Sequence, residues 1–285
     1  MGEIAYVNGK WTKPEKAMVP AEDRGYLFGD ALYEVVAGFD GRLWALERHL
    51  RRLEQGIREV EMEGVDIAHV RSVIEEAFRR SKLSDAMVYI QLTRGVAPRQ
   101  HDWRPGLSPS LFVFVRPLPQ VETRLREEGA SLITVPEIRW GRCDIKSTNL
   151  LPNCLAKHKA HASGAFDAVF LRPDGIVTEC ASNSLFIVKE ARLITRENGP
   201  HILPGITREL VLETAQRIGI PADLRPFTRE ELFAADEAFL TGTSLDLLPV
   251  TRVDERTIGG GTAGELTERL RQAYLDRRKR GDDTP

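Results

Sequence analysis

Two closely spaced prolines, Pro117 and Pro119, constrain the fold more than any other feature of this chain. Proline fixes one backbone angle and donates no backbone hydrogen bond, so regular pairing cannot continue through both positions. The chain has 285 residues. A single hydrophobic core of ordinary size does not organise a chain of this length. We therefore expect an N-terminal α+β domain over residues 1–116, a linker over 117–121, and a larger C-terminal α+β domain over 122–285.

The sequence on both sides of this linker predicts helices as well as strands. Leu50, Leu53 and Ile57 share one helical stripe with charges elsewhere, the pattern of an amphipathic helix. The Asn8-Gly9 pair stands between two short apolar runs and predicts a hairpin, because this pair favours a two-residue turn. We expect helices at residues 47–60, 67–80, 121–128, 149–162, 206–218 and from about 263, and strands at 4–7, 10–12, 31–39, 42–45, 87–93, 111–115, 132–139, 167–171, 176–179, 184–188, 193–195, 222–226, 238–241 and 248–253.

Composition excludes several classes of function. The formal net charge is −2, which gives no basic footprint for nucleic acid. No apolar run approaches the roughly 20 residues that a membrane span needs, and the N-terminus lacks the basic start and apolar core of a secretory signal. The three cysteines form no CxxC pair, so neither a disulfide frame nor a metal site is expected. We expect a cytoplasmic protein without a bound metal.

The lysine with the strongest claim to a chemical role is Lys146. It follows a strand-like run and precedes a helix-like one, and Asp144, Ser147, Thr148 and Asn149 surround it with short polar side chains. Such residues fix turns and helix starts. A lysine that is held in place and partly desolvated loses affinity for a proton and can attack a carbonyl. The alternative is an ordinary solvated lysine, which is the commoner case.

Two loops suggest a phosphate-bearing ligand. Pro204-Gly205-Ile206-Thr207 enters a helix, where free backbone N–H groups and the helix dipole favour anions. Thr241-Gly242-Thr243-Ser244 ends a strand and could serve the same anion. Most such loops bind nothing, so this pair suggests a phosphate site without requiring one.

Three further side chains have both a functional and an ordinary interpretation. Glu179 ends an apolar run, so it is either exposed at the edge of a sheet or buried with a cationic partner. Arg99 and His101 lie in the long polar loop 94–110. In an extended segment their side chains would point to one side, and a guanidinium beside an imidazole can bind a carboxylate. The alternative is a solvated loop.

Several motifs, in order along the chain, resemble those of the class IV (fold type IV) pyridoxal phosphate aminotransferases, and most closely those of the D-amino-acid branch. The motifs are EDRGYLFGDALYEV at 22–35, ERHLRRL at 47–53, TRGVAPRQH at 93–101, IRWGRCDIKSTNLLPNCLAK at 138–157, VTECASNSLF at 177–186, ILPGITRELV at 202–211, and the strand that ends in Thr241-Gly242-Thr243. The resemblance covers most of the chain. The Arg-x-His pair at 99–101 is the part specific to the D-amino-acid branch.

This resemblance implies a role for each matching residue. Lys146, in the C-terminal domain, would form a Schiff base with pyridoxal 5'-phosphate and move the substrate proton, and Glu179 would hold the proton on the pyridine nitrogen. Tyr33, Arg99 and His101 would bind the substrate carboxylate, the last two from the neighbouring subunit of a homodimer. The remaining residues implied in cofactor binding are Arg52, Leu203, Ile206, Thr207, Gly242 and Thr243. Gly242 stands where relatives often have serine.

The resemblance implies a transaminase that uses D-alanine or D-glutamate with a 2-oxo acid such as 2-oxoglutarate or pyruvate. Two enzymes of the same fold are alternatives, namely an aminodeoxychorismate lyase and a branched-chain L-amino-acid aminotransferase. A non-enzymatic carrier of the cofactor is a third alternative, against which the intact lysine, glutamate and carboxylate-binding residues argue.

Overall fold

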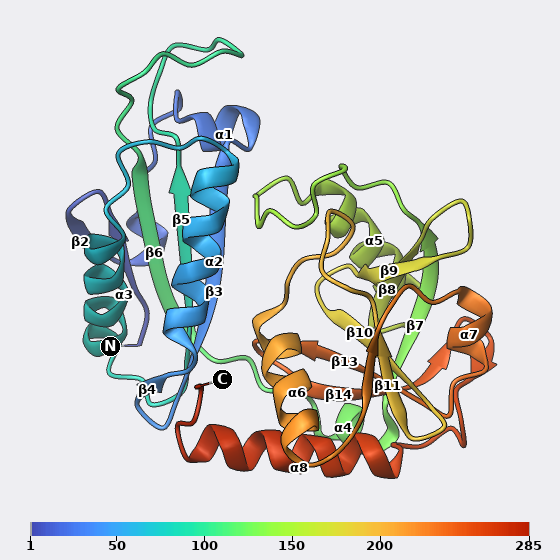
Figure 1. Cartoon of the computed structure of the whole chain (residues 1–285). Helices are drawn as coiled ribbons and strands as arrows, with labels where there is room; N and C mark the ends of the chain where they lie inside the picture. Colours follow the sequence, from blue (N-terminus) through green and yellow to red (C-terminus); the bar gives the residue numbers. More distant parts are fainter. Residues whose placement is uncertain (1, 285) are drawn as a thin grey trace. The chain divides into compact units, whose positions relative to one another are not determined.

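The computed structural model describes residues 2–284, which form two compact units (Figure 1). Unit 1 consists of residues 2–119 and 145–149, and unit 2 of residues 120–144 and 150–284. The expected domains, 1–116 and 122–285, placed Lys146 in the C-terminal domain, whereas its contacts assign it to unit 1. The physical reason is backbone pairing of residues 146–148 with a strand of that unit, which a linear reading of the chain cannot detect.

Unit 1 is a six-stranded antiparallel sheet with two long helices on one face (Figure 1). The strand order is β2-β1-β6-β5-β3-β4. The strands are β1 (Ile4–Val7), β2 (Lys10–Thr12), β3 (Ala31–Phe39), β4 (Arg42–Leu43), β5 (Ala86–Thr93) and β6 (Ser110–Pro117). The helices are η1 (Pro14–Lys16), α1 (Arg24–Phe28), α2 (Leu46–Glu59) and α3 (Ile67–Ser81).

Local sequence signals explain several of these elements. Asn8 and Gly9 have φ angles of 43° and 90°, which the two central positions of a tight hairpin turn require. Alternate residues of the central strands, among them Val88 and Ile90, share one hydrophobic core with Leu50 and Leu53 of α2, as period-two and period-3.6 patterns dictate. The short helix α1 was not expected, since five residues carry too little periodicity to detect.

One group of charged side chains is buried inside unit 1. Glu34 is 2 % exposed, and its carboxylate accepts two hydrogen bonds from Arg52, at 2.7 and 2.8 Å, while His49 Nδ1 lies 2.7 Å from it. Burial opposes ionisation of Glu34, but Arg52 and His49 outweigh it and hold the pKa of Glu34 far below its ordinary value. This group joins β3 to α2 through charge rather than through apolar contact.

Unit 2 is built on a mixed nine-stranded sheet. Its strand order is β12-β11-β10-β13-β14-β7-β8-β9, with β15 beside β14. The strands are β7 (Ala130–Pro136), β8 (Asp167–Leu171), β9 (Val177–Cys180), β10 (Ser184–Lys189), β11 (Arg192–Thr195), β12 (Ala222–Leu224), β13 (Glu237–Gly242), β14 (Asp246–Val253) and β15 (Arg256–Thr257). The helices are α4 (Thr123–Glu128), α5 (Leu151–Ala162), α6 (Ile206–Arg217), α7 (Arg229–Phe233) and α8 (Glu265–Lys279).

The mixture of helices and sheets in both units confirms the expected α+β class. The strand expected at 132–139 ends at Pro136, and Arg139, beyond its end, pairs with the carboxylates of Glu137 and Glu179. The helix expected from residue 149 begins at Leu151, with Pro152 in its first turn, where its missing N–H costs little. Within residues 2–284, no helix has the length and apolar character needed to cross a bilayer.

Replacing Glu34 with Gln should destabilise unit 1 by about 3–5 kcal/mol at pH 7, because Arg52 keeps a buried charge without its counter-ion. Since the folded-state pKa of Glu34 lies below its unfolded value, this stabilisation is complete above about pH 5. It is lost as pH falls below about pH 4. Urea unfolding of both proteins between pH 3 and pH 7 measures the difference, which should shrink at the acidic end.

Glu47→Gln, on α2, is the matched control for Glu34→Gln, on β3. Glu47 pairs with Arg71 at the surface, with 55 % of its side chain exposed, so its loss should cost less than about 1 kcal/mol. Equal effects of the two substitutions, or a Glu34→Gln effect that does not change with pH, would contradict the prediction.

Candidate active site

Lys146 is held against the edge of β3 in unit 1. The Tyr33 N–H donates to the Lys146 carbonyl at 3.0 Å, and the Thr148 N–H donates to the Ala31 carbonyl at 3.1 Å. The Thr148 hydroxyl also donates to the Gly29 carbonyl at 3.2 Å. Through these bonds, residues 146–148 pair with β3 as a short additional strand would. The lysine therefore lies on a fixed backbone, as the short polar residues around it led us to expect.

The Lys146 side chain lies over an aromatic face. Its Nζ is 4.0 Å from the centre of the Tyr33 ring, within the range of a cation–π contact. Tyr33 stacks on Tyr89 at 5.7 Å, and Tyr89 stacks on Phe114 at 4.9 Å. The Tyr89 hydroxyl donates to Gln91 at 2.7 Å, and burial raises the pKa of Tyr89 to about 12. Lys146 and Tyr33, which were predicted to share one site, are thus in contact.

Arg52 lies on α2 in the same unit and is fixed by Glu34, as described above. Burial lowers the pKa of the neighbouring His49, and the charges of Arg52 and Lys146 lower it further against the effect of Glu34. Glu34 and His49 were not identified from the sequence. A single glutamate within an apolar strand is the signal that could have suggested a buried partner for the arginine.

Arg99 and His101 lie on the loop between β5 and β6, at the same end of the sheet as α1 (Figure 1). Both side chains contact the ring of Phe28: the Arg99 guanidinium lies 5.4 Å from its centre and the His101 ring 5.6 Å. Both are exposed, and within residues 2–284 neither side chain forms a hydrogen bond or an ion pair. A guanidinium and an imidazole that lie against the same ring, and that form no ion pair within the described chain, are suited to binding the carboxylate of a ligand.

In unit 2, Glu179 is buried and paired with a cation. Arg139 donates to Glu179 Oε1 at 2.5 Å, and the Leu203 N–H donates to the same oxygen at 3.1 Å. Oε2 has no hydrogen bond within the described part of the chain. Burial raises the pKa of Glu179, against the effect of Arg139. The carboxylate therefore has one anchored oxygen and a second oxygen that can hold a proton on a ligand.

Arg139 was missed as a functional residue, although it opens the stretch that contains Lys146. Its side chain is 5 % exposed and also donates to Glu137, to the Thr178 hydroxyl and to the His201 carbonyl. Its guanidinium lies 4.4 Å from the Phe170 ring centre. An arginine that follows a strand with a glutamate two residues earlier gave a local hint, but its second carboxylate is forty residues away.

The two small-residue loops of unit 2, residues 204–207 and 241–244, both lie close to Asn183 and Ser184. Ser184 pairs with Thr241 across β10 and β13. A Cβ on Gly205 would lie 2.7 Å from the Ser184 hydroxyl, and a Cβ on Gly242 would lie 2.5 Å from Asn183 Oδ1. Both glycines are therefore needed for close approach of the backbone. Leu203 precedes the first loop, and its N–H donates to the Glu179 carboxylate.

These residues fit a phosphate-bearing cofactor. Ile206 and Thr207 begin α6, whose N-cap Gly205 provides no side-chain hydrogen bond to the first N–H groups, and such groups bind anions. The Thr241 hydroxyl is buried without a hydrogen-bond partner within residues 2–284, which is unusual for a native structure. At position 242, a side chain would collide with Asn183, so only the backbone is available there.

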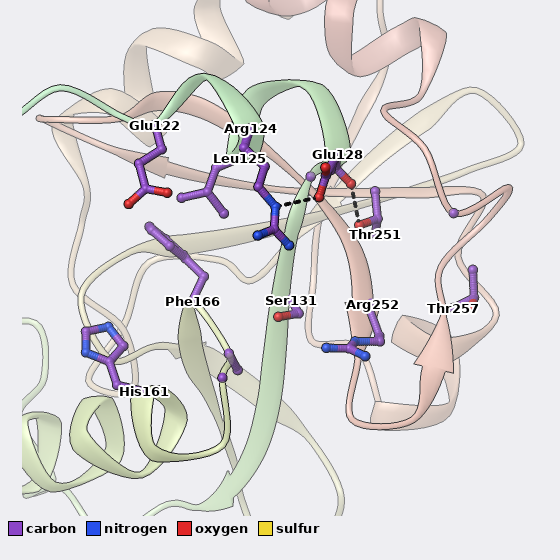
Figure 2. Close-up of a pocket in the computed structure, with 14 residues that line it drawn as sticks. Glu122, Arg124, Leu125, Glu128, Ser131, His161, Phe166, Thr251, Arg252 and Thr257 are labelled. Carbon is purple, nitrogen blue, oxygen red and sulfur yellow. Dashed lines mark hydrogen bonds and ion pairs between the residues drawn. The ribbon is translucent and has the colours of Figure 1, made fainter.

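A separate polar pocket of about 640 Å³ lies in unit 2 (Figure 2). Arg124, His161 and Arg252 contribute nitrogen atoms to its lining, and Arg124 is paired with Glu128. None of the predicted site residues lines this pocket, so we do not assign it to the active site. No group of three or more potential metal ligands is present within the described residues.

Comparisons with known proteins agree with the motifs. The model of the family "Amino-transferase class IV" matches residues 31–253. D-alanine aminotransferase of Bacillus licheniformis is 38 % identical over 93 % of this chain and 94 % of its own length. The enzyme of that name from Listeria monocytogenes is 36 % identical over 95 % of this chain and 94 % of its own.

The fold agrees as well. Branched-chain amino acid aminotransferase of Escherichia coli superimposes with a TM-score of 0.89 at 23 % identity, over 97 % of this chain and 94 % of that structure. The branched-chain enzyme from Thermoproteus uzoniensis, solved with norvaline, gives 0.86 at 24 % identity over 98 % of this chain and 95 % of that structure. Another branched-chain enzyme, solved with pyridoxamine 5'-phosphate, gives 0.88 at 26 % identity over 97 % and 94 %. By its sequence relatives and by its fold, this chain belongs to the class IV aminotransferases.

Proposed function

We propose that this chain is a pyridoxal phosphate-dependent transaminase that moves amino groups between D-amino acids, such as D-alanine and D-glutamate, and 2-oxo acids. The observation that carries the proposal is the pair Arg99 and His101, whose side chains both lie against the ring of Phe28. This pair gives a site for the carboxylate that both kinds of substrate share. The relatives named as D-alanine aminotransferases support the choice of the D series.

Each predicted residue has a part that its surroundings support. The bound cofactor supplies an aldehyde to receive the amino group and a ring that withdraws electrons. Lys146, on its fixed backbone, is the residue to bind that aldehyde and to carry the substrate proton. The second oxygen of Glu179 would keep the ring nitrogen of the cofactor protonated. Tyr33 lies close enough to Lys146 to help position the substrate carboxylate.

The phosphate of the cofactor is assigned to one cation and to two loops. Arg52 contributes positive charge, and Glu34 fixes the direction in which its guanidinium points. The start of α6 contributes the N–H groups of Ile206 and Thr207, and Thr243 contributes a further hydroxyl. Gly242 would contribute only its backbone N–H, and Leu203 would pack against the ring of the cofactor.

We further propose that the enzyme is a homodimer in which Arg99 and His101 serve the active site of the neighbouring subunit. Their exposure in the single chain supports this arrangement, since a carboxylate-binding pair at a subunit interface must be accessible before assembly. The expected cytoplasmic location belongs to this proposal too. It is supported by Cys143, Cys154 and Cys180, which are all free thiols.

Purified wild-type protein with pyridoxal phosphate should transfer the amino group of D-alanine to 2-oxoglutarate. Lys146→Ala should lower this activity by more than about a thousandfold and remove the visible absorption band of the bound cofactor. Lys159→Ala, which removes an exposed lysine of α5, should change neither. Transfer from L-leucine but not from D-alanine, or pyruvate release from aminodeoxychorismate, would replace the proposal with one of the two related activities.

The shared site can be tested with mixed dimers. The Lys146→Ala homodimer should be inactive, and Arg99→Ala should raise the KM for D-alanine by about 10- to 100-fold, as expected for a lost charge-assisted hydrogen bond. A dimer with one chain of each kind should contain one site with wild-type KM. In that site the lysine comes from one chain and the arginine from the other. If the mixed dimer keeps the raised KM, the pair acts within its own chain.

A further inference from the structure

The loop that carries Arg99 and His101, residues 94–110, is held by a buried arginine, Arg24. The sequence motifs imply no function for this arginine. The Arg24 side chain is 3 % exposed, although arginine is rarely found so deeply buried without a set of partners. It begins α1 and lies beneath the loop that carries Arg99 and His101. Its backbone N–H also donates to the Gly95 carbonyl, where the loop starts, at 2.9 Å.

The Arg24 guanidinium binds three consecutive carbonyl groups of that loop. Nη1 donates to Gln100 at 2.8 Å and to Asp102 at 3.2 Å, and Nη2 donates to His101 at 3.0 Å. Nε donates to Asp30 at 2.8 Å. Four of the five donors of the side chain are thus used. The carbonyls of residues 100–102 thus all turn toward one cation, which constrains the backbone around His101.

A second arginine completes the support. The Arg94 side chain is 6 % exposed, shares the Asp30 carboxylate at 2.8 Å, and donates to the carbonyls of Val60 and Glu61 at 2.7 and 2.9 Å. The ring centre of Trp103 lies 3.9 Å from its guanidinium. The loop is therefore tied on one side to α1 and on the other to the segment after α2.

This arrangement also explains the place of Phe28. The Arg24 guanidinium lies 4.9 Å from the centre of the Phe28 ring, and Arg99 and His101 contact the same ring. The buried cation fixes the backbone of the loop, and the aromatic ring orients its two exposed side chains. A loop of this length without regular structure would otherwise be mobile.

We propose that Arg24 is a positioning residue for the substrate carboxylate: by binding the carbonyls of residues 100–102, it holds Arg99 and His101 in the geometry that recognises the acid end of amino acids and 2-oxo acids. Arg24 acts through the loop and does not touch the substrate. Its loss should therefore weaken substrate binding and leave the chemistry at Lys146 largely intact. This inference rests on the proposed function.

Arg24→Gln and Arg24→Lys, compared with wild-type holoenzyme, test the proposal. We expect the KM values for D-alanine and 2-oxoglutarate to rise by about tenfold or more in both variants, because neither side chain can reach all three carbonyls. kcat and the dissociation constant of pyridoxal phosphate should change by less than about threefold. The inhibition constant of propionate, a simple carboxylate, should rise in parallel with KM. Arg104→Gln, at an exposed arginine of the same loop without an ion pair within the described residues, is the matched control and should behave as wild type.

A double-mutant cycle separates positioning from a general loss of structure. In an Arg99→Ala, His101→Ala background, Arg24→Gln should raise KM no further, because the groups it positions are gone. Additive effects, or a fall in kcat without a change in KM, would overturn the proposal. Trp103→Ala covers the case in which the Arg24 variants fail to fold, since Trp103 is 45 % exposed. It should raise KM as well, and an unchanged KM would count against the proposal.

Hydrogen exchange distinguishes this proposal from the proposed function. Amides of residues 99–103 should exchange faster in Arg24→Gln than in wild type, while Arg104→Gln leaves them unchanged. If wild-type enzyme shows no D-alanine activity, the proposed function fails. If wild type is active and the exchange rates and KM values of Arg24→Gln match it, the positioning role fails alone.

Discussion

The candidate site depends first on the backbone pairing between residues 146–148 and β3. Two backbone hydrogen bonds, to Lys146 and from Thr148, attach a segment that is distant in sequence to the strand that also carries Tyr33. Main-chain bonds of this kind place a side chain more precisely than a loop can. The same strand carries Glu34, the partner of Arg52. One strand therefore positions Lys146, its aromatic neighbour Tyr33 and Glu34.

Both units use the same physical solution for their functional charges. In unit 1, Glu34 fixes Arg52, and Asp30 fixes Arg24 and Arg94. In unit 2, Arg139 fixes Glu179. Each buried ion is costly when alone and acceptable when its hydrogen bonds are satisfied. The consequence is that each of these side chains is held in place by hydrogen bonds to a partner of opposite charge. Such preorganisation is what recognition of small charged substrates requires.

Much of the fold was predictable, and the reasons are local. Hairpin turns such as Asn8-Gly9 and the apolar stripe of α2 follow from steric limits and periodicity, which act over a few residues. The lysine, Glu179 and the Arg99/His101 pair were selected because their motifs are contiguous in sequence. The missed residues, among them Arg24, Arg139 and Glu34, are ordinary charges by local criteria. Each of them has at least one partner that lies between fifteen and more than seventy residues away.

The sequence by itself determined the α+β class, most of the strands and helices, and the residue types that a transaminase of this family needs. Only the tertiary structure decided which charges are buried together, that Lys146 packs with unit 1, and that Arg24 binds the loop after β5. The physical reason is range. Turn geometry and side-chain periodicity are encoded by neighbours in sequence, whereas a buried ion pair or a loop bound by a distant arginine exists only after the chain has folded.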